Sequence, residues 1–369
     1  MTQPAFLHGP LRDAALRAVV LGAATPGRPA RLAGHALRAG PDPDHPALAP
    51  DAAEAVEGLL VELDDAARTR LDFWHGLAGH APGPARAQTG AGAVAATIWT
   101  GPAAADAWDG ADWAARLAPL ARLAAQEAMA LAQERPAAET ARRWPVIRTR
   151  AQARLNAAAG PGPARLRRPT RPGDVEVLTR RTPYAGFFAV EDYTLRHARF
   201  AGGMSEPVTR TAFVSVDAVT VLPYDPARDR VLLIEQFRAG PFARGDPQCW
   251  SLEAIAGRID PGESPEESAR REALEEAGLA LGRLIRLFGY YPTPGAKTEF
   301  LHAYLALAEL PDGAAGLGGA PEEHEDIRGH LVPFARLEEL MVTGEIANAP
   351  LLLSVLELRA RRPALRESR

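Results

Sequence analysis

The stretch GRIDPGESPEESARREALEEAGL, residues 257–279, decides the fold of the second half of this chain. Ser264 followed by Pro265 predicts a helix that begins with a side-chain cap and carries proline in its first turn. Glu267, at the third helical position, completes a capping box. Gly278 suits the end of the helix, because glycine readily adopts the left-handed conformation found there. The sequence therefore predicts a helix from Ser264 to just before Gly278.

Three glutamates of this helix, Glu272, Glu275 and Glu276, stand three and four positions apart, so their carboxylates gather on one face. Like charges placed so close repel one another, and a cation usually offsets them. Carboxylate oxygens suit Mg²⁺ or Mn²⁺, which share their coordination between protein and substrate phosphates. Arg270 and Arg271 lie nearby and can balance the remaining charge. The alternative is an acidic helix face that only contacts water.

The whole stretch resembles the Nudix box, Gly-x5-Glu-x7-Arg-Glu-U-x-Glu-Glu-x-Gly-U, where U is a bulky aliphatic residue. Ala273 departs from the pattern at the first U position, which is a packing position. A chance match of the other fixed positions is on the order of one in 10⁸ per start position, given average residue usage. These positions are Gly257, Glu263, Arg271, Glu272, Glu275, Glu276 and Gly278. The resemblance implies a hydrolase that cleaves a nucleoside diphosphate linked to another group.

From Gly186 to Leu356 the sequence also resembles the bacterial ADP-ribose pyrophosphatases. This resemblance implies hydrolysis of ADP-ribose to AMP and ribose 5-phosphate. Close relatives cleave GDP-mannose, so GDP-mannose or another nucleotide sugar is the alternative substrate, and a nucleotide sensor without turnover is the alternative from another class. The supporting stretches are GFF (186–188), LPYDP (222–226), LIEQFR (233–238), PTPG (292–295), EHEDIR (323–328) and IANA (346–349).

The resemblance also implies roles in metal binding and catalysis. Glu272 and Glu276, with the backbone carbonyl of Ala256 and with Glu325 from a later loop, are the expected ligands of Mg²⁺, with Mn²⁺ possible. Such ions polarise the diphosphate and lower the pKa of bound water. The expected catalytic residues are Glu323 as general base and, within the box, Glu275 and Arg271. For the loop that carries Glu323, the alternative is a solvated acidic segment.

A further group of residues matches positions that line the substrate site in these relatives. Two aromatic residues border the base, although aromatic residues are more often core. One arginine is expected to reach the site from a partner subunit, which implies a homodimer with composite sites. The expected substrate-binding residues are Phe187, Phe188, Arg210, Arg238, Arg258, Thr293 and Glu299. Arg238 could instead be an edge-strand charge, and Arg258 stands where relatives often have an apolar residue.

The composition is that of an ordinary globular protein with 369 residues, 47% of them hydrophobic and 24% charged. The formal net charge of −4 gives no basic excess to neutralise phosphates, so extended nucleic-acid binding is not expected. Cys249 is the only cysteine, which fits a reducing cytoplasm. We expect a cytoplasmic protein with no export signal and no membrane span. Lys297 is the only lysine among 42 lysine and arginine residues.

The chain length predicts two domains. We expect a front domain over residues 1–110, a helical linker over 111–170 and the Nudix domain over 171–369. Short strands are predicted up to about residue 100. Helices are predicted near 103–133, 139–158, 264–277 and 349–361, and later strands near 175–178, 187–195, 213–222, 231–237 and 300–307. The fold class is α/β (α+β), with a C-terminal α/β/α sandwich built on a mixed sheet.

The front domain weakly resembles the γ-glutamylcyclotransferase-like fold, a small β-barrel with helices. The similar stretches are FLHGPLR (6–12), ARLAGH (30–35), VEGLL (56–60) and LDFWHG (71–76). His75 replaces the acid/base glutamate and Pro10 replaces a loop threonine. A binding, dimerising or regulatory module is therefore expected rather than a second enzyme. The order of the two domains is similar to that in proteins linked to tellurite resistance.

Overall fold

The computed structural model describes residues 3–160, 162–320 and 325–367. The chain divides into two compact units, Met1–Pro163 and Ala164–Arg369. Each unit has its own sheet and its own core, and each is described by itself. In the described part of the chain, no helix combines the length and the apolar character needed to cross a lipid bilayer.

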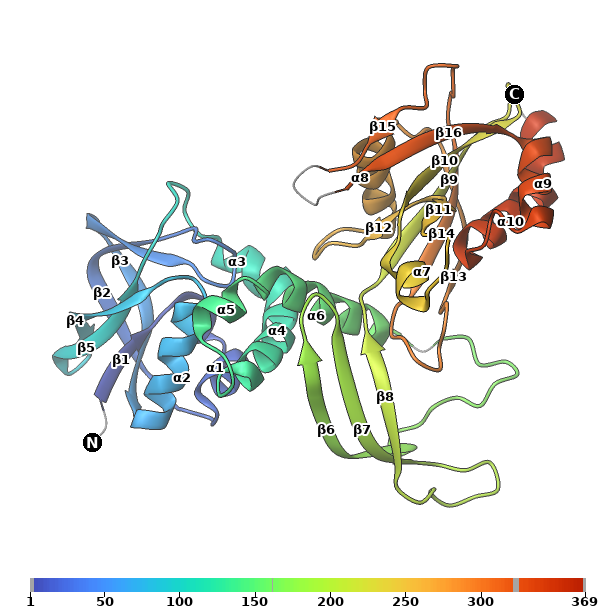
Figure 1. Ribbon diagram of the computed structural model, residues 1–369. Coiled ribbons are helices and arrows are strands. Elements are labelled where there is room, and N and C mark those ends of the chain that lie inside the picture. Colours follow the sequence, from blue (N-terminus) through green and yellow to red (C-terminus); the bar gives the residue numbers. More distant parts are fainter. Residues whose placement is uncertain (1–2, 161, 321–324, 368–369) are drawn as a thin grey trace. The chain divides into compact units, whose positions relative to one another are not determined.

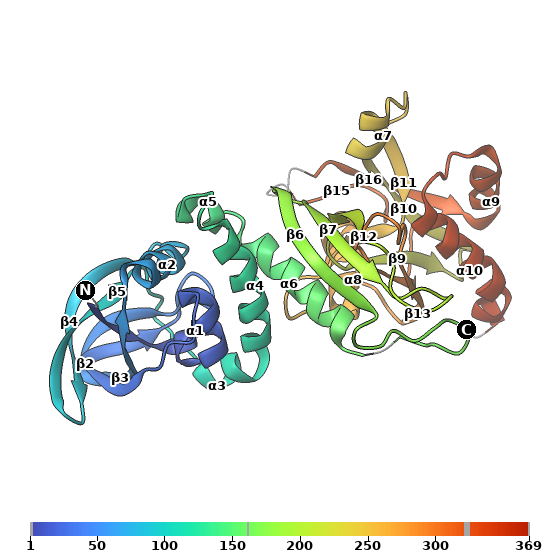
Figure 2. The same ribbon diagram turned by 90° about the horizontal axis from the view of Figure 1, so that it is seen from below.

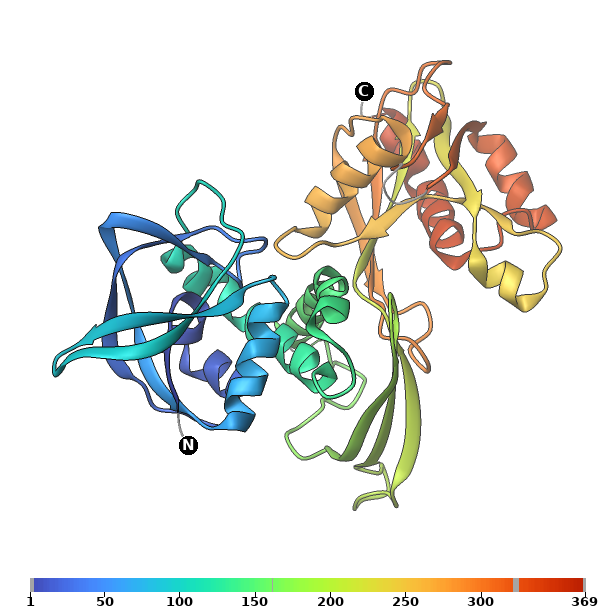
Figure 3. The same ribbon diagram turned by 60° about the vertical axis from the view of Figure 1, so that its left-hand side comes forward.

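A closed five-stranded barrel forms the first unit (Figure 3, blue strands), in the order β1-β3-β2-β4-β5. The parallel bridge between Ala5 and Thr97 closes it. Phe6, Leu32 and Ile98 are among the side chains that fill its interior. This confirms the expected β-barrel with helices. The strands are β1 (Gln3–Leu7), β2 (Arg28–Arg38), β3 (Ala47–Leu63), β4 (Ala81–Thr89) and β5 (Gly92–Thr100).

Helices of the first unit differ from the predicted ones. The sequence located no helix between residues 1 and 100, but two helices form there, each capped by an aspartate that accepts a backbone N–H: Asp13 from Leu16 and Asp64 from Ala67. The helix expected from residue 103 begins only at 110, where Asp109 caps it. The helices are α1 (Ala14–Leu21), α2 (Asp65–Gly76), α3 (Gly110–Asp112), α4 (Ala118–Leu131), α5 (Ala137–Ala141) and α6 (Trp144–Ala158), with a 3-10 turn at Gly9–Arg12 and a π turn at Trp113–Leu117.

Two sheets build the second unit. One is a three-stranded antiparallel sheet (Figure 2, green strands) of β6 (Val175–Ala185), β7 (Ala189–His197) and β8 (Val208–Val214). The other is a mixed sheet in the order β13-β14-β9-β10-β16-β15, in which β11 pairs with β10, β12 pairs with β9, and β14 runs parallel to β9. Its strands are β9 (Ala218–Asp225), β10 (Arg230–Phe237), β11 (Trp250–Glu253), β12 (Ile255–Arg258), β13 (Leu284–Tyr290), β14 (Leu301–Leu307), β15 (Leu317–Gly318) and β16 (Ile327–Pro333).

Both faces of the mixed sheet are buried. Successive side chains of a strand point to opposite faces, so each strand contributes to both cores. On β9, Val221 packs in the core that includes Ala269 of helix α8, whereas Leu222 packs in the core that includes Leu351 of α10. Helices therefore cover the sheet on both sides (Figure 1). They are α8 (Pro265–Ala277) on one face, and α9 (Phe334–Thr343) and α10 (Ala349–Glu367) on the other; α7 (Ala239–Arg244) is a short helix after β10.

One predicted strand of the second unit is wrong. The apolar run over 213–222 is divided between two sheets, because β8 ends at Val214 and β9 begins at Ala218. The break is held by Thr298, whose hydroxyl accepts from Ser215 N at 2.9 Å and donates to Ser215 O at 2.8 Å. A continuous apolar run in the sequence gives no sign that the chain passes from one sheet to the other there. Helix α10 also runs on to Glu367, beyond the predicted end near residue 361.

Candidate active site

Helix α8 begins and ends as its sequence predicts. The hydroxyl of Ser264 accepts from Glu267 N at 3.2 Å, and the Glu267 carboxylate accepts from Ser264 N at 2.8 Å. This reciprocal capping box satisfies two backbone donors that the helix leaves free. At the other end Gly278 takes φ of +60°, in the left-handed region. The caps fix which face of α8 carries the three glutamates.

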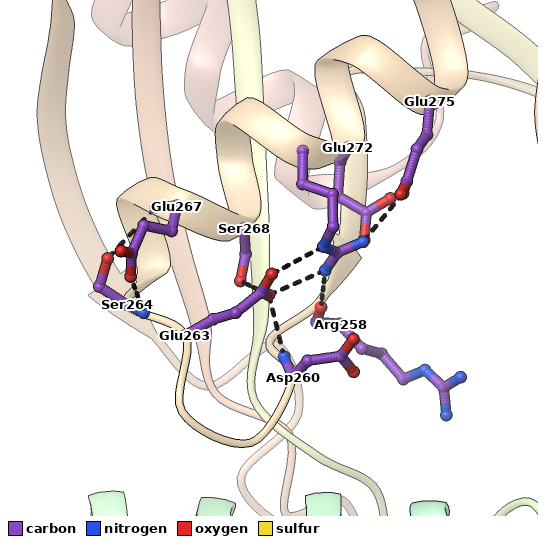
Figure 4. A network of polar contacts seen from close by, with 9 residues as sticks. Arg258, Asp260, Glu263, Ser264, Glu267, Ser268, Glu272 and Glu275 are labelled. Atoms are coloured by element: carbon purple, nitrogen blue, oxygen red, sulfur yellow. Dashed lines mark hydrogen bonds and ion pairs between the residues drawn. The ribbon is translucent and has the colours of Figure 1, made fainter. Parts of the chain in front are cut away.

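Arg271 links the carboxylates of Glu263, Glu272 and Glu275, which are labelled in Figure 4. Its Nε and Nη2 donate to the two oxygens of Glu263 at 2.9 and 3.0 Å. Its Nη1 donates to Glu272 at 2.8 Å and to Glu275 at 2.9 Å, and Nη2 also donates to the carbonyl of Arg258 at 3.0 Å. Hydrogen bonding from Arg271 holds the pKa of Glu263 down at about 2. Arg271 therefore ties the helix to the β12 loop and neutralises much of the acidic face.

Glu272 projects from α8 against Gly257 of β12. A Cβ atom built on Gly257 would lie 1.9 Å from the Glu272 carboxylate. Burial raises the pKa of Glu272 to about 7, against the opposing effect of Arg271 and with the repulsion of Glu275 and Glu325. The first glycine of the box thus makes room for a carboxylate whose charge is incompletely balanced.

Glu276 is the most deeply buried glutamate of the helix, with 2% of its surface exposed. Its carboxylate accepts from Ala256 N at 3.1 Å. Burial, opposed by this hydrogen bond and reinforced by the nearby charges of Glu272 and Glu325, raises its pKa to about 9. A carboxylate that is buried beside other negative charges is unstable as an anion unless a cation binds next to it.

The residues around Glu272 and Glu276 fit a divalent cation that takes few protein ligands. Within residues 3–160, 162–320 and 325–367, no three acidic, histidine or cysteine side chains stand close enough to form a metal site alone. Mg²⁺ usually keeps several ligands from water and phosphate and needs only one or two carboxylates. The two glutamates with raised pKa values are the residues that could supply them.

This electrostatic arrangement predicts a stability that depends on pH and on metal. The folded-state pKa values of Glu272 and Glu276 lie above the usual 4.5. The contribution of these two groups to the stability of the second unit should therefore be fully present below about pH 4.5 and fall as pH rises, by roughly 1.4 kcal/mol per pH unit for each group, up to about pH 7 for Glu272 and about pH 9 for Glu276. Thermal unfolding at pH 6 and pH 8 should show a larger stabilisation by Mg²⁺ at pH 8, and an equal shift at both pH values would contradict this.

A cavity of about 440 Å³ opens beside this part of α8. It brings together most of the residues that the sequence predicts for substrate and metal. The predicted residues on its wall are Phe187, Phe188, Arg238, Ala256, Arg258, Arg271, Glu272, Glu299 and Glu325. Glu276 lies behind the wall, bonded to the backbone of Ala256.

One side of the cavity is aromatic. The guanidinium of Arg258 lies 4.2 Å from the ring centroid of Phe187, which is 55% exposed. Phe187 contacts Phe188 edge-on, and Phe188 contacts Phe213 at 4.7 Å between ring centroids. An exposed aromatic ring stacked by a cation is suited to hold a flat nucleobase. Arg258 is thus part of the aromatic side of the cavity.

Arg238 lies at the end of β10 and is paired with a residue that the sequence analysis missed. Its Nε and Nη2 donate to the two oxygens of Glu253 at 2.9 and 2.6 Å. Such a bidentate pair fixes the plane of the guanidinium. Arg238 is therefore an oriented cation on the cavity wall.

Not every predicted residue reaches the cavity. In the described part of the chain, the wall does not include Arg210 on β8, Thr293 in the turn before β14, or Glu275, whose carboxylate bonds to Arg271. Glu323 lies outside the described residues. The wall also includes Glu253, Ser215 and Lys297, which the sequence analysis did not place there. Only Lys297 had a visible signal, as the single lysine of the chain.

Comparison with known proteins agrees with this geometry. Residues 214–353 match the model of the NUDIX domain. An ADP-ribose pyrophosphatase of Escherichia coli (strain K12) is 38% identical over 193 residues, which are 52% of this chain and 91% of the relative. An ADP-ribose pyrophosphatase of Haemophilus influenzae is 37% identical over 47% of this chain and 81% of its own length.

A GDP-mannose pyrophosphatase of Enterobacter sp. (strain 638) is 31% identical over 179 residues, 48% of this chain and 92% of the relative. Residues 214–353, which match the NUDIX domain, include the box helix, the mixed sheet and the cavity wall apart from Phe187 and Phe188. Through its second unit the chain belongs to the Nudix family and is a Nudix hydrolase related to the ADP-ribose and GDP-mannose pyrophosphatases.

Proposed function

We propose that this protein hydrolyses the diphosphate of ADP-ribose to AMP and ribose 5-phosphate. The observation that carries the proposal is the pair of carboxylates Glu272 and Glu276, whose pKa values are raised by burial next to a cavity with an aromatic and a cationic side. Strongly perturbed carboxylates in a cleft are typical of catalytic sites. The similarity to ADP-ribose pyrophosphatases supports this choice of substrate.

In this proposal Glu272 and Glu276, with the carbonyl of Ala256 and with Glu325, hold Mg²⁺ or Mn²⁺. The bound ion supplies a Lewis acid for the diphosphate and acidifies water. Arg271 keeps Glu272 in place through its hydrogen bond of 2.8 Å, and Glu275 holds Arg271 from the other side. Glu323 is the proposed general base. Hydrolysis adds one water across the P–O–P linkage and releases the two monophosphates.

The cavity wall gives the nucleotide an orientation. Phe187 and Arg258 would hold the base, and the guanidinium of Arg238, fixed by Glu253, would face the anionic phosphates. Oriented binding of this kind contributes to rate because the reacting groups no longer have to find one another. Thr293 and Glu299 complete the proposed substrate site.

The identity of the nucleotide sugar is tested by comparing kcat/KM for ADP-ribose and for GDP-mannose at the same Mg²⁺ concentration. We expect ADP-ribose to be favoured by at least about ten-fold, a difference of some 1.4 kcal/mol in transition-state binding. The 31% identity to a GDP-mannose pyrophosphatase makes GDP-mannose the second candidate. A preference for GDP-mannose would replace the proposed substrate and leave the reaction class unchanged.

We also propose a homodimer in which Arg210 serves the site of the partner subunit. Arg210 lies on β8 of the three-stranded sheet and is exposed, away from the cavity of its own chain. The same sheet exposes Val175, Val177 and Tyr184. Light scattering should give twice the chain mass, and Arg210→Ala should raise KM without changing the oligomer. A monomer with full activity would contradict this assembly.

For the first unit we propose a γ-glutamylcyclotransferase-like module that binds a ligand or regulates the enzyme. The closed barrel and its helices support the fold assignment. His75 is buried in the interior of this unit, stacked on Trp99 at 4.8 Å between ring centroids. Removal of the first unit should then change the regulation or assembly of the enzyme more than its chemistry.

A further inference from the structure

The only lysine of the chain lies on the wall of the proposed active site. Lys297 lines the cavity, whereas every other basic side chain apart from histidine is arginine. The two residue types are not interchangeable, since the ammonium is a compact charge with three donors and the guanidinium is a large planar fork. At this position the chain therefore presents the smaller of the two cationic groups.

The backbone around Lys297 is held firmly. Phe213 N donates to the carbonyl of Ala296 at 2.7 Å, and Thr298 N donates to the carbonyl of Phe213 at 3.1 Å. The hydroxyl of Thr298 bonds to both backbone groups of Ser215. The segment that carries Lys297 is thus fastened to the point where the chain passes from β8 to β9. The side chain starts from a rigid base, as a specific contact requires.

The Lys297 ammonium forms an electrically neutral pair with Glu299. Nζ donates to Glu299 Oε1 at 2.9 Å, and the Ser215 hydroxyl lies 3.4 Å from the same oxygen. Within the described residues this is the one hydrogen bond of the ammonium, which leaves two of its three donors for the cavity. The ring of Phe213 lies 5.9 Å from Nζ. The wall here presents donors, an acceptor and an apolar surface side by side.

We propose that Lys297 and Glu299 together bind two neighbouring hydroxyls of a ribose ring of the substrate. A donor and an acceptor 2.9 Å apart match vicinal hydroxyls, each of which can donate and accept. A phosphate is a poorer occupant, because it would meet the negative charge of Glu299 together with the positive charge of Lys297. Phe213 offers an apolar face for the C–H side of a sugar. The assignment rests on the proposed nucleotide-sugar hydrolysis and makes Lys297 a specificity-determining residue.

Kinetics of Lys297→Met and Lys297→Arg test the role. We expect Lys297→Met to raise KM for ADP-ribose about ten-fold and to change kcat by less than about two-fold, because a binding contact and not a transition-state contact is lost. Lys297→Arg should not restore KM. Arg336→Met, at an exposed ion pair with Glu339 on α9, is the matched control and should behave as wild type. A KM within two-fold of wild type for Lys297→Met would overturn the proposal.

Chemical labelling provides a measurement independent of turnover. With a single lysine, reductive methylation followed by peptide mass spectrometry reports on Lys297 alone, and an added lysine derivative serves as a rate standard. AMP, ribose 5-phosphate and inorganic diphosphate are each added at ten times their inhibition constants. We expect AMP or ribose 5-phosphate to slow methylation at least about five-fold, and the one that does so identifies which ribose is bound.

If inorganic diphosphate slowed methylation as much as the more protective of AMP and ribose 5-phosphate, the proposal would be overturned in favour of a phosphate contact. The absence of protection by either ribose compound would overturn it as well. Failure of the proposed function would look different, since wild-type protein would then release no AMP from ADP-ribose. An active wild-type enzyme whose Lys297 variants and labelling are unaffected would contradict only the role of Lys297.

Discussion

Replacing Glu276 by glutamine should lower kcat for ADP-ribose in Mg²⁺ by at least about a thousand-fold. The variant loses the negative charge that attracts the ion, and with the ion it loses electrostatic stabilisation of the transition state. The amide oxygen of glutamine can still accept the hydrogen bond from Ala256 N that the carboxylate accepts at 3.1 Å. The fold should therefore survive, so that a loss of activity would result from the missing charge of Glu276.

Glu266→Gln is the matched control for this variant. Glu266 lies in the first turn of the same helix and is exposed. We expect its activity to equal that of wild type within about two-fold, as surface substitutions of this kind have small effects. Without Mg²⁺, Glu276→Gln should unfold at a higher temperature than wild type at pH 8, because glutamine is neutral at any pH whereas the buried Glu276 must take up a proton when the chain folds. Activity of Glu276→Gln within ten-fold of wild type would contradict the role of Glu276.

Acid should unfold the first unit at a pH where the second is still folded. His8, His75 and His80 are buried in the first unit, with 4%, 5% and 5% of their surfaces exposed. Within the described residues, both ring nitrogens of His8 and His80 and Nδ1 of His75 have no hydrogen-bond partner. Burial, together with repulsion from neighbouring histidines, lowers the pKa of His8 to about 3 and of His80 to about 4, and lowers that of His75 in the same direction.

The sign of the effect follows from these pKa values. A histidine whose pKa is lowered on folding takes up its proton more readily in the unfolded chain, so stability is lost as pH falls below the unfolded value of 6.5. Three such residues remove about 4 kcal/mol per pH unit, enough to unfold a domain of ordinary stability near pH 5.

Tryptophan fluorescence can follow this transition, because Trp250 alone of the six tryptophans lies outside the first unit. His75→Leu should move the midpoint to lower pH, by about half a unit or more. His197→Asn, at an exposed position of the second unit, is the control and should leave the midpoint in place. A first unit that keeps its native fluorescence at pH 4 would contradict this account of the buried histidines.

Features encoded by residues close together in sequence were predicted correctly. The box helix follows from its caps, Ser264 with Glu267 at one end and Gly278 at the other. The aromatic and arginine residues of the cavity wall were found by resemblance to a family, since their residue types alone are as common in cores and on surfaces. Most of the predicted site residues lie on the wall.

Features that depend on distant segments were not predicted. Glu253, Ser215 and Lys297 reach the cavity from β11, from the passage between two sheets and from a turn before β14. Their meeting depends on strand order, which no local pattern encodes. The run over 213–222 was read as one strand for the same reason. Helices α1 and α2 were overlooked because Asp13 and Asp64, their caps, also suit turns between strands.

The most direct test of the central claim is the product analysis of ADP-ribose hydrolysis. Purified protein is incubated with ADP-ribose and Mg²⁺, and AMP and ribose 5-phosphate are quantified beside the Glu276→Gln and Glu266→Gln variants. The account predicts equal amounts of the two monophosphates, dependent on Mg²⁺, abolished in Glu276→Gln and retained in Glu266→Gln. Absence of either product from the wild-type reaction, or equal activity of the two variants, would contradict it.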